Sequence, residues 1–193
     1  MTKDPFKDRE RGLEEDFFRK TDAKLIEKMR EKGKLDEIVM DLAQTLQVEN
    51  PELLRRVMAL GIDRNTGAAL LLAPLVQVAW AEGKVTHRER ETVLRIARSR
   101  GVEDGSPAQT QLLAWLQTHP PQAVFDAAIE AIKAGLSHLT PNEREERIAS
   151  IVQACREVSE ASGGIAKALG VGNGVSTEEQ SVLDVVTSAL RSP

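Results

Sequence analysis

The sequence predicts an all-α protein, and three observations support this fold class. Aromatic residues make up only 3% of the 193 residues, and Tyr is absent. Apolar residues recur at helical spacings, and capping residues followed by Pro or Glu precede many of the apolar runs. No segment shows the sustained alternation between turns that is typical of a β-strand. We therefore expect helices packed on helices in a compact multi-helix bundle.

Residues 1–62 are predicted to form an N-terminal helical extension. Residues 8–32 are highly charged and carry apolar residues at helical spacings, which favours one long amphipathic helix. A second helix is expected over residues 35–46, where apolar residues form a stripe. A third is expected over residues 50–61, with Asn50 as its cap and a proline at its first helical position.

Residues 63–193 are predicted to form the main helical domain. An apolar run from Ala68 to Ala81 predicts a buried helix that is kinked at Pro74. The run is about 14 residues long, whereas a membrane-spanning helix needs ~20, so no integral membrane segment is expected. Further helix starts are indicated at Thr86, Ser106, Pro120-Pro121, Thr140 and Ser176.

Charge and cysteine usage narrow the class of protein. A net charge of -4 and a pI near 5.5 lack the basic footprint of a nucleic-acid-binding protein, so no nucleic-acid partner is expected. The single Cys155 excludes an internal disulfide, and the first residues are charged rather than apolar. Both observations favour the cytoplasm.

Two stretches of the main domain resemble each other. In the first, residues 78–83 end in a glycine turn and are followed by residues 85–89, which form a capping box. In the second, residues 158–163 also end in glycine, and residues 175–179 form a capping box after an insertion. The sequence therefore predicts two pseudo-repeated helical hairpins.

At these residues the chain resembles the tellurite-resistance TerB family. Family members carry an Ala-Asp-Gly turn, a small apolar residue and a Glu that opens the next helix, and Ala81-Glu82-Gly83, Val85 and Glu89 occupy these places. The likeness covers about residues 66–190. It implies a compact helical domain, a role in tellurite or general stress response, and an acidic surface that binds a divalent cation, Ca²⁺ or Mg²⁺.

By position, the resemblance assigns metal-binding roles to Glu82, Glu89 and its counterpart Glu179. Glu82 lies near a helix C-terminus, where the dipole disfavours negative charge by ~0.3–1 kcal/mol, so Lys84 or a bound cation would offset it. Glu89 is also explained by capping alone, and Ca²⁺ or Mg²⁺ sites usually need more oxygen ligands. In the second repeat, Ser162 stands where Glu82 stands in the first. A purely structural role for the three acids is the alternative.

The remaining chemically distinctive residues predict no further site. The three histidines have no partner at metal-ligand spacing and are expected on the surface. Cys155 occupies an apolar position of its helix, which predicts a buried thiol. The glycine-rich residues 163–174 follow no strand and lack a Gly-Lys-Ser/Thr ending, so we expect a loop rather than a phosphate-binding site.

The first predicted helix carries a line of cations. Four lysines recur at every fourth position, and such a line is compatible with peripheral association with an anionic membrane surface. A solvated face balanced by neighbouring acids is the simpler interpretation. The lysines are Lys20, Lys24, Lys28 and Lys32.

Together these patterns favour a non-enzymatic binding or scaffold protein with a protein partner, because no catalytic constellation is recognisable. The alternative is a regulatory inhibitor that uses the N-terminal amphipathic helix on an ATPase or similar machine. Residues 6–10, with Glu14 and Phe17, have a weak similarity to small bacterial ATPase-inhibitor proteins. A metal-dependent enzyme is the third hypothesis, disfavoured by the lack of a Glu-x-x-His pair. The sequence leaves the homo-oligomeric state open.

Overall fold

The regular elements of the chain are helices, as a computed structural model shows. The structure describes residues 20, 24–30, 39–162 and 175–192, and no strand occurs among them. The all-α prediction is thus confirmed. The chain divides into two compact units, Met1–Met40 and Asp41–Pro193. In the first unit, residues 24–30 are helical and exposed, while most of the predicted helix over residues 8–32 lies outside the described residues.

The second unit begins at Asp41, so it holds most of the helix over residues 39–46 and all of the next helix, the two shorter helices that the sequence assigned to the extension. Residues 39–46 are helical, and α2 (Pro51–Ala59) follows. The Asn50 side chain accepts hydrogen bonds from the backbone N–H groups of Glu52 and Leu53, which confirms the predicted cap. α2 packs against α7 (Gln122–Leu136), and Arg56 of α2 forms an ion pair with Glu130 of α7.

The boundary between the units therefore lies after Met40, whereas the sequence places it after residue 62. The polar cluster at residues 63–66 marks the predicted boundary. In the structure it is a tight turn, because the Asp63 carboxylate accepts hydrogen bonds from the backbone N–H groups of Asn65 and Thr66. Such a turn joins two packed helices of one unit.

The apolar run after this turn forms two short helices and not one kinked helix. These are α3 (Gly67–Leu70) and α4 (Ala73–Ala79), and Pro74 lies in the first turn of α4. Proline has no N–H to donate, so it suits a helix start better than a helix interior. The backbone between the helices turns tightly, with Leu72 donating to the carbonyl of Ala69 at 3.0 Å. The predicted kink at Pro74 is thus a break.

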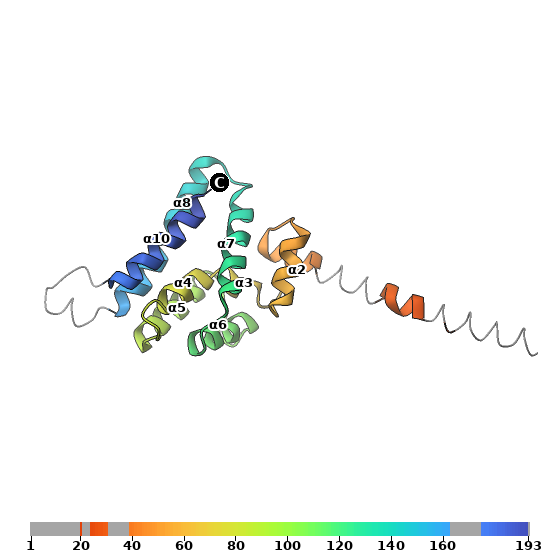
Figure 1. Cartoon of the computed structure of the whole chain (residues 1–193), viewed down its shortest axis with the longest axis horizontal. Helices are drawn as coiled ribbons and strands as arrows, with labels where there is room; N and C mark the ends of the chain where they lie inside the picture. The colour runs from red at the N-terminus through yellow and green to blue at the C-terminus, as the bar shows by residue number, and fades with distance from the viewer. Residues whose placement is uncertain (1–19, 21–23, 31–38, 163–174, 193) are drawn as a thin grey trace, which may run out of the picture. The chain divides into compact units, whose positions relative to one another are not determined.

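α4 forms the centre of the second unit. It contacts α5, α6, α7, α8 and α10, and its apolar side chains are almost completely buried. α8 also packs against α5 and α10, and Figure 1 shows α8 and α10 side by side. The bounds of these helices are α5 (His87–Ser99), α6 (Pro107–Gln117), α8 (Pro141–Ser162) and α10 (Thr177–Arg191).

An aromatic cluster joins the central helix to α6 and α7. The indole N–H of Trp80 donates a hydrogen bond of 2.8 Å to the carbonyl oxygen of Trp115. The His119 ring lies edge-on to Trp80 and to Phe125, with centroids 5.2 and 5.6 Å away. Phe125 is among the largest fully buried side chains of the described core. These contacts link the end of α4 to α6 and to the start of α7.

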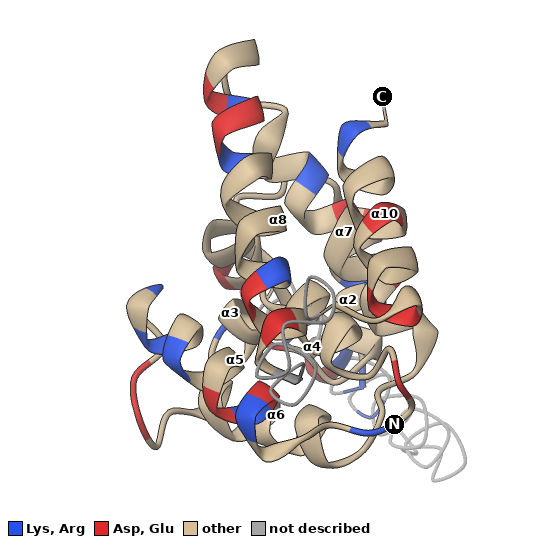
Figure 2. Ribbon diagram, turned by 90° about the vertical axis from the view of Figure 1, so that its left-hand side faces the viewer, with Lys and Arg blue, Asp and Glu red and all other residues tan. Residues whose placement is uncertain are grey.

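Charged positions are interspersed over the helices of this unit, with acidic and basic residues close to one another along the chain (Figure 2). Several of them form exposed ion pairs between helices, such as Arg95 with Glu157 at 3.0 Å. Exposed pairs of this kind contribute little to stability. No helix in the described parts of the chain combines the length and apolar character needed to cross a membrane.

Candidate functional site

The two predicted capping boxes are both formed, and their glutamates are buried. In α5 the Thr86 N–H donates to Glu89 Oε2 at 2.6 Å, and the Glu89 N–H donates back to the Thr86 hydroxyl. In α10 the Ser176 N–H donates to Glu179 Oε2 at 2.7 Å, with the same return bond. Glu89 is 2% exposed and Glu179 is fully buried. The hydrogen bonds explain how carboxylates persist at these depths.

Electrostatics couples the three acids that the sequence singles out. The pKa of Glu89 is raised, chiefly by burial, and the hydrogen bonds from Thr86 oppose the rise. The negative charges of Glu179 and of the exposed Glu82 raise it further. Glu143, at the start of α8, also accepts a hydrogen bond from the backbone N–H of the residue three positions earlier, Thr140. Glu143 is exposed, however, and its pKa is lowered. Burial therefore decides the sign of the shift at Glu89.

This shift predicts how pH acts on stability. Because the pKa of Glu89 is raised above the ordinary value of 4.5, the folded protein holds this proton more tightly than the unfolded chain. The contribution of Glu89 to the free energy of unfolding is therefore present below that value and lost as pH rises through the raised pKa. Glu89→Gln removes the titration and keeps an oxygen that accepts from Thr86. We expect urea unfolding to show a smaller loss of stability above pH 4.5 in this variant than in the wild type.

Glu143→Gln is the matched control for this experiment. The pKa of Glu143 is lowered, so its contribution to the free energy of unfolding is lost only as pH falls below 4.5. Above that value, the stability of Glu143→Gln should change with pH as the stability of the wild type does. A wild-type pH dependence in Glu89→Gln would contradict the coupling of this buried carboxylate.

The metal-binding role of Glu82, Glu89 and Glu179 stays a prediction, and capping accounts for the two buried glutamates. No group of three or more His, Cys, Asp or Glu side chains in the described parts of the chain is placed to hold a metal. Each buried glutamate uses one oxygen for its capping bond, and Glu82 lies exposed in the turn before α5. Ca²⁺ usually takes about six to eight oxygen ligands, and Mg²⁺ requires an octahedron. The geometry favours capping as the role of the buried pair.

A second feature is a groove with an apolar base, which we call the arginine groove. Its volume is about 560 Å³, and its walls come from the end of helix 39–46, from α3, from α7, from α8 and from the residues after α5. Gly135 of α7 and Ala68 of α3 also line the groove, and both are small residues. The apolar side chains at its base include Leu46, Leu72, Ile132, Leu136 and Ile151.

Two arginines give this groove a positive rim. Arg100 follows α5, and its Nη2 donates to the carbonyl oxygen of Ser150 in α8 at 3.2 Å. The pKa of Arg100 is lowered, chiefly by partial burial; Cys155 opposes this shift, the positive charge of Arg147 adds to it, and Glu157 opposes it least. Among the described residues, neither arginine has a carboxylate partner within ion-pair distance. The rim therefore carries two neighbouring positive charges.

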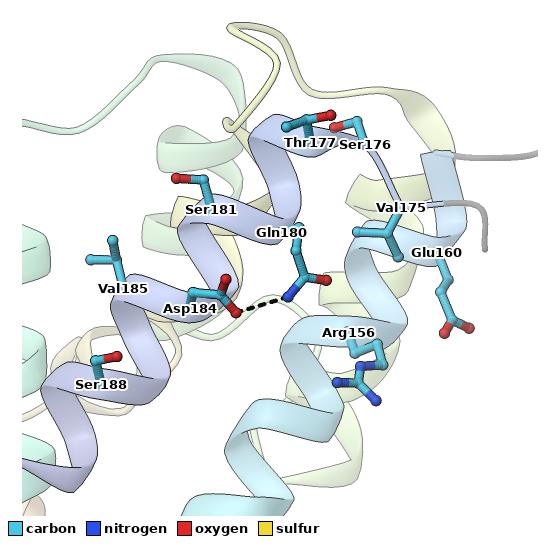
Figure 3. A pocket seen from close by; sticks show the side chains of 10 residues that line it. All are labelled: Arg156, Glu160, Val175, Ser176, Thr177, Gln180, Ser181, Asp184, Val185 and Ser188. Carbon is cyan, nitrogen blue, oxygen red and sulfur yellow. Dashed lines mark hydrogen bonds between the residues drawn. The ribbon is translucent and has the colours of Figure 1, made fainter. Parts of the chain in front are cut away.

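A larger hollow of about 1100 Å³ lies between α8 and α10 (Figure 3). Most of the residues that line it are of polar type, and Gln180 Nε2 donates to Asp184 Oδ1 at 2.8 Å. Arg156 and Glu160 belong to its lining on the α8 side. Val175 at its edge directly follows residues 163–174, which lie outside the described residues together with the predicted glycine-rich loop. We therefore assign no ligand to this hollow.

The other sequence predictions concern isolated residues. Cys155 is fully buried, as predicted, and burial raises the pKa of its thiol to about 12. A thiol with such a pKa is not a nucleophile at neutral pH. The three histidines are exposed, also as predicted. Of the four lysines, Lys20, Lys24 and Lys28 are exposed, and Lys32 lies outside the described residues.

Sequence reasoning missed the arginine groove. Arg100 and Arg147 belong to different helical segments, and no local pattern around either of them signals that they meet. The only signal is indirect, because each lies near a buried apolar position of its own segment, Ile96 or Ile148.

Compared with protein-family models, with characterised proteins and with solved structures, the chain has no match.

Proposed function

We propose that the chain is a non-enzymatic, TerB-like binding protein in a stress-response assembly, and that the arginine groove receives an acidic amphipathic helix of a partner protein. The observation that supports this most directly is the combination of an apolar base with two arginines that have no carboxylate partner among the described residues. The sequence supports the general class through its helical pattern, and the resemblance to the TerB family supplies the link to stress.

The chemistry of the groove defines the partner segment. An amphipathic helix inserts apolar side chains at positions spaced by three and four residues into a groove of this kind. Leu72, Ile132 and Ile151 offer apolar contacts at the base. Arginine guanidinium groups form charge-assisted, often bidentate hydrogen bonds with carboxylates, so Glu or Asp beside the apolar face would meet Arg100 and Arg147.

The first test uses a defined probe in place of the partner. A fluorescent helical peptide with a Leu face and a flanking Glu row is titrated into the full chain, and anisotropy gives its dissociation constant. We expect Arg100→Glu combined with Arg147→Glu to weaken binding at least ~100-fold, because each charged hydrogen bond contributes about 1.5 kcal/mol or more. A peptide with Lys in place of Glu should not bind the wild type.

The matched control is Arg55→Glu combined with Arg88→Glu. Both residues are exposed, neither lines the groove, and the change in net charge is the same. This control should bind the Glu peptide like the wild type. Equal weakening in the two double variants would mean that only net charge matters, and the proposed role of the groove would be lost. The circular dichroism of all variants must show a folded protein.

A further inference from the structure

The short described helix of the first unit exposes large apolar side chains. Leu25 is 57% exposed, Ile26 50% and Met29 67%. These are half of the six large apolar side chains that are exposed in the described chain, and they fall within residues 24–30. Single exposed apolar residues are ordinary, but a cluster of this kind marks an interaction surface.

The order of the residues places this apolar cluster on one side of the helix. With about 3.6 residues per turn, Leu25, Met29 and Ile26 fall within an arc of about 100°. Lys28 borders the arc on one side and Arg30 on the other, while Glu27 falls on the opposite side. Lys24 falls about 100° from Leu25, on the polar side of the helix next to Glu27.

We propose that this helix binds an anionic lipid surface, lying in the plane of the membrane interface with its apolar arc in the lipid. An interfacial helix has this distribution of residues, with an apolar face bordered by Lys and Arg. The long side chains of Lys28 and Arg30 can reach outward to lipid phosphates while their methylene groups stay beside the acyl chains. The short apolar arc makes the binding reversible.

Charge favours a lipid surface over a second copy of the chain as the occupant. If two copies of this helix paired through their apolar arcs, the bordering positions would meet, and these hold Lys28 and Arg30. Like charges at such positions repel. Glu27 lies about 150° from the centre of the arc, away from the contact between the copies. An anionic surface instead meets cations on both borders of the arc.

The experiment is sedimentation of the full chain with vesicles of phosphatidylcholine, alone or mixed with phosphatidylserine. The net charge of -4 opposes binding to the anionic vesicles, so any binding must come from a local cationic surface. We expect the chain to sediment with the mixed vesicles only. A cation near such a surface strengthens binding about 5-fold, so Lys28→Glu combined with Arg30→Glu should weaken it ~25-fold or more.

Two further variants distinguish lipid binding from a general charge effect and from self-association. Leu25→Ser combined with Met29→Ser should also abolish sedimentation, because the apolar arc is lost and the charge is unchanged. Arg55→Glu combined with Lys84→Glu changes the net charge equally outside this helix and should bind like the wild type. Absence of wild-type sedimentation overturns the proposal, as does equal loss in both charge-reversed variants. A dimer that Leu25→Ser with Met29→Ser dissociates, without vesicle binding, would overturn it in favour of self-association.

Discussion

Phe125→Ala is expected to lower the free energy of unfolding by about 3–5 kcal/mol, the range typical of a phenylalanine deleted from a packed core. Phe125 is 2% exposed in the first turn of α7, and its ring lies edge-on to His119. The substitution removes the ring and leaves a cavity where α4, α6 and α7 meet. Chemical denaturation, followed by the helical signal in circular dichroism, measures the effect.

Leu113→Ala is the control for this core substitution. Leu113 lies on α6 and is 37% exposed, so less apolar surface is lost from the interior than at Phe125. We expect a loss of about 1 kcal/mol, well below that of the core substitution. If Phe125→Ala were as mild as Leu113→Ala, α7 would not be packed on the core in the way that the structure shows.

The helix starts were predictable because capping is a local interaction. Asn50, Thr86 and Ser176 accept hydrogen bonds from N–H groups two or three residues later, so a short stretch of sequence contains both partners. The same locality explains the error at Pro74. An apolar run predicts burial but does not distinguish one helix from two, and a proline suits either a kink or a helix start.

The candidate site was less predictable because it depends on tertiary packing. The sequence identifies Glu89 and Glu179 as equivalent capping residues, but only the packed helices bury both of them. Their burial is what separates them from Glu143, which has the same local pattern and stays exposed. The arginine groove is wholly non-local, because Arg100 and Arg147 come together only when α8 packs on α5.

The largest combined effect on stability is expected from Glu89→Ala together with Glu179→Ala. Each substitution leaves a backbone N–H, that of Thr86 or Ser176, without its side-chain acceptor, which costs about 1–3 kcal/mol where the group is shielded from water. Lost packing adds to this cost, and we expect the double variant to lose about 4 kcal/mol. Urea unfolding of the wild type, of both single variants and of the double variant completes a double-mutant cycle.

The two substitutions should not be additive, and the sign of the difference follows from charge. Glu179 raises the pKa of Glu89 through the repulsion between two carboxylates. Each single substitution therefore loses a cap but relieves this repulsion, whereas the double variant loses both caps and relieves it only once. The double variant should lose more stability than the sum of the single variants at neutral pH. The excess should shrink at low pH, where Glu89 is protonated.

The matched pair for this cycle is Glu89→Ala with Glu143→Ala. These two substitutions should be additive, because Glu143 does not contribute to the shift at Glu89. Glu143 also opens a helix with a capping bond to Thr140, so the comparison keeps the kind of contact and removes only the repulsion between buried carboxylates. Additivity of Glu89→Ala and Glu179→Ala at every pH would instead show that the buried carboxylates do not interact.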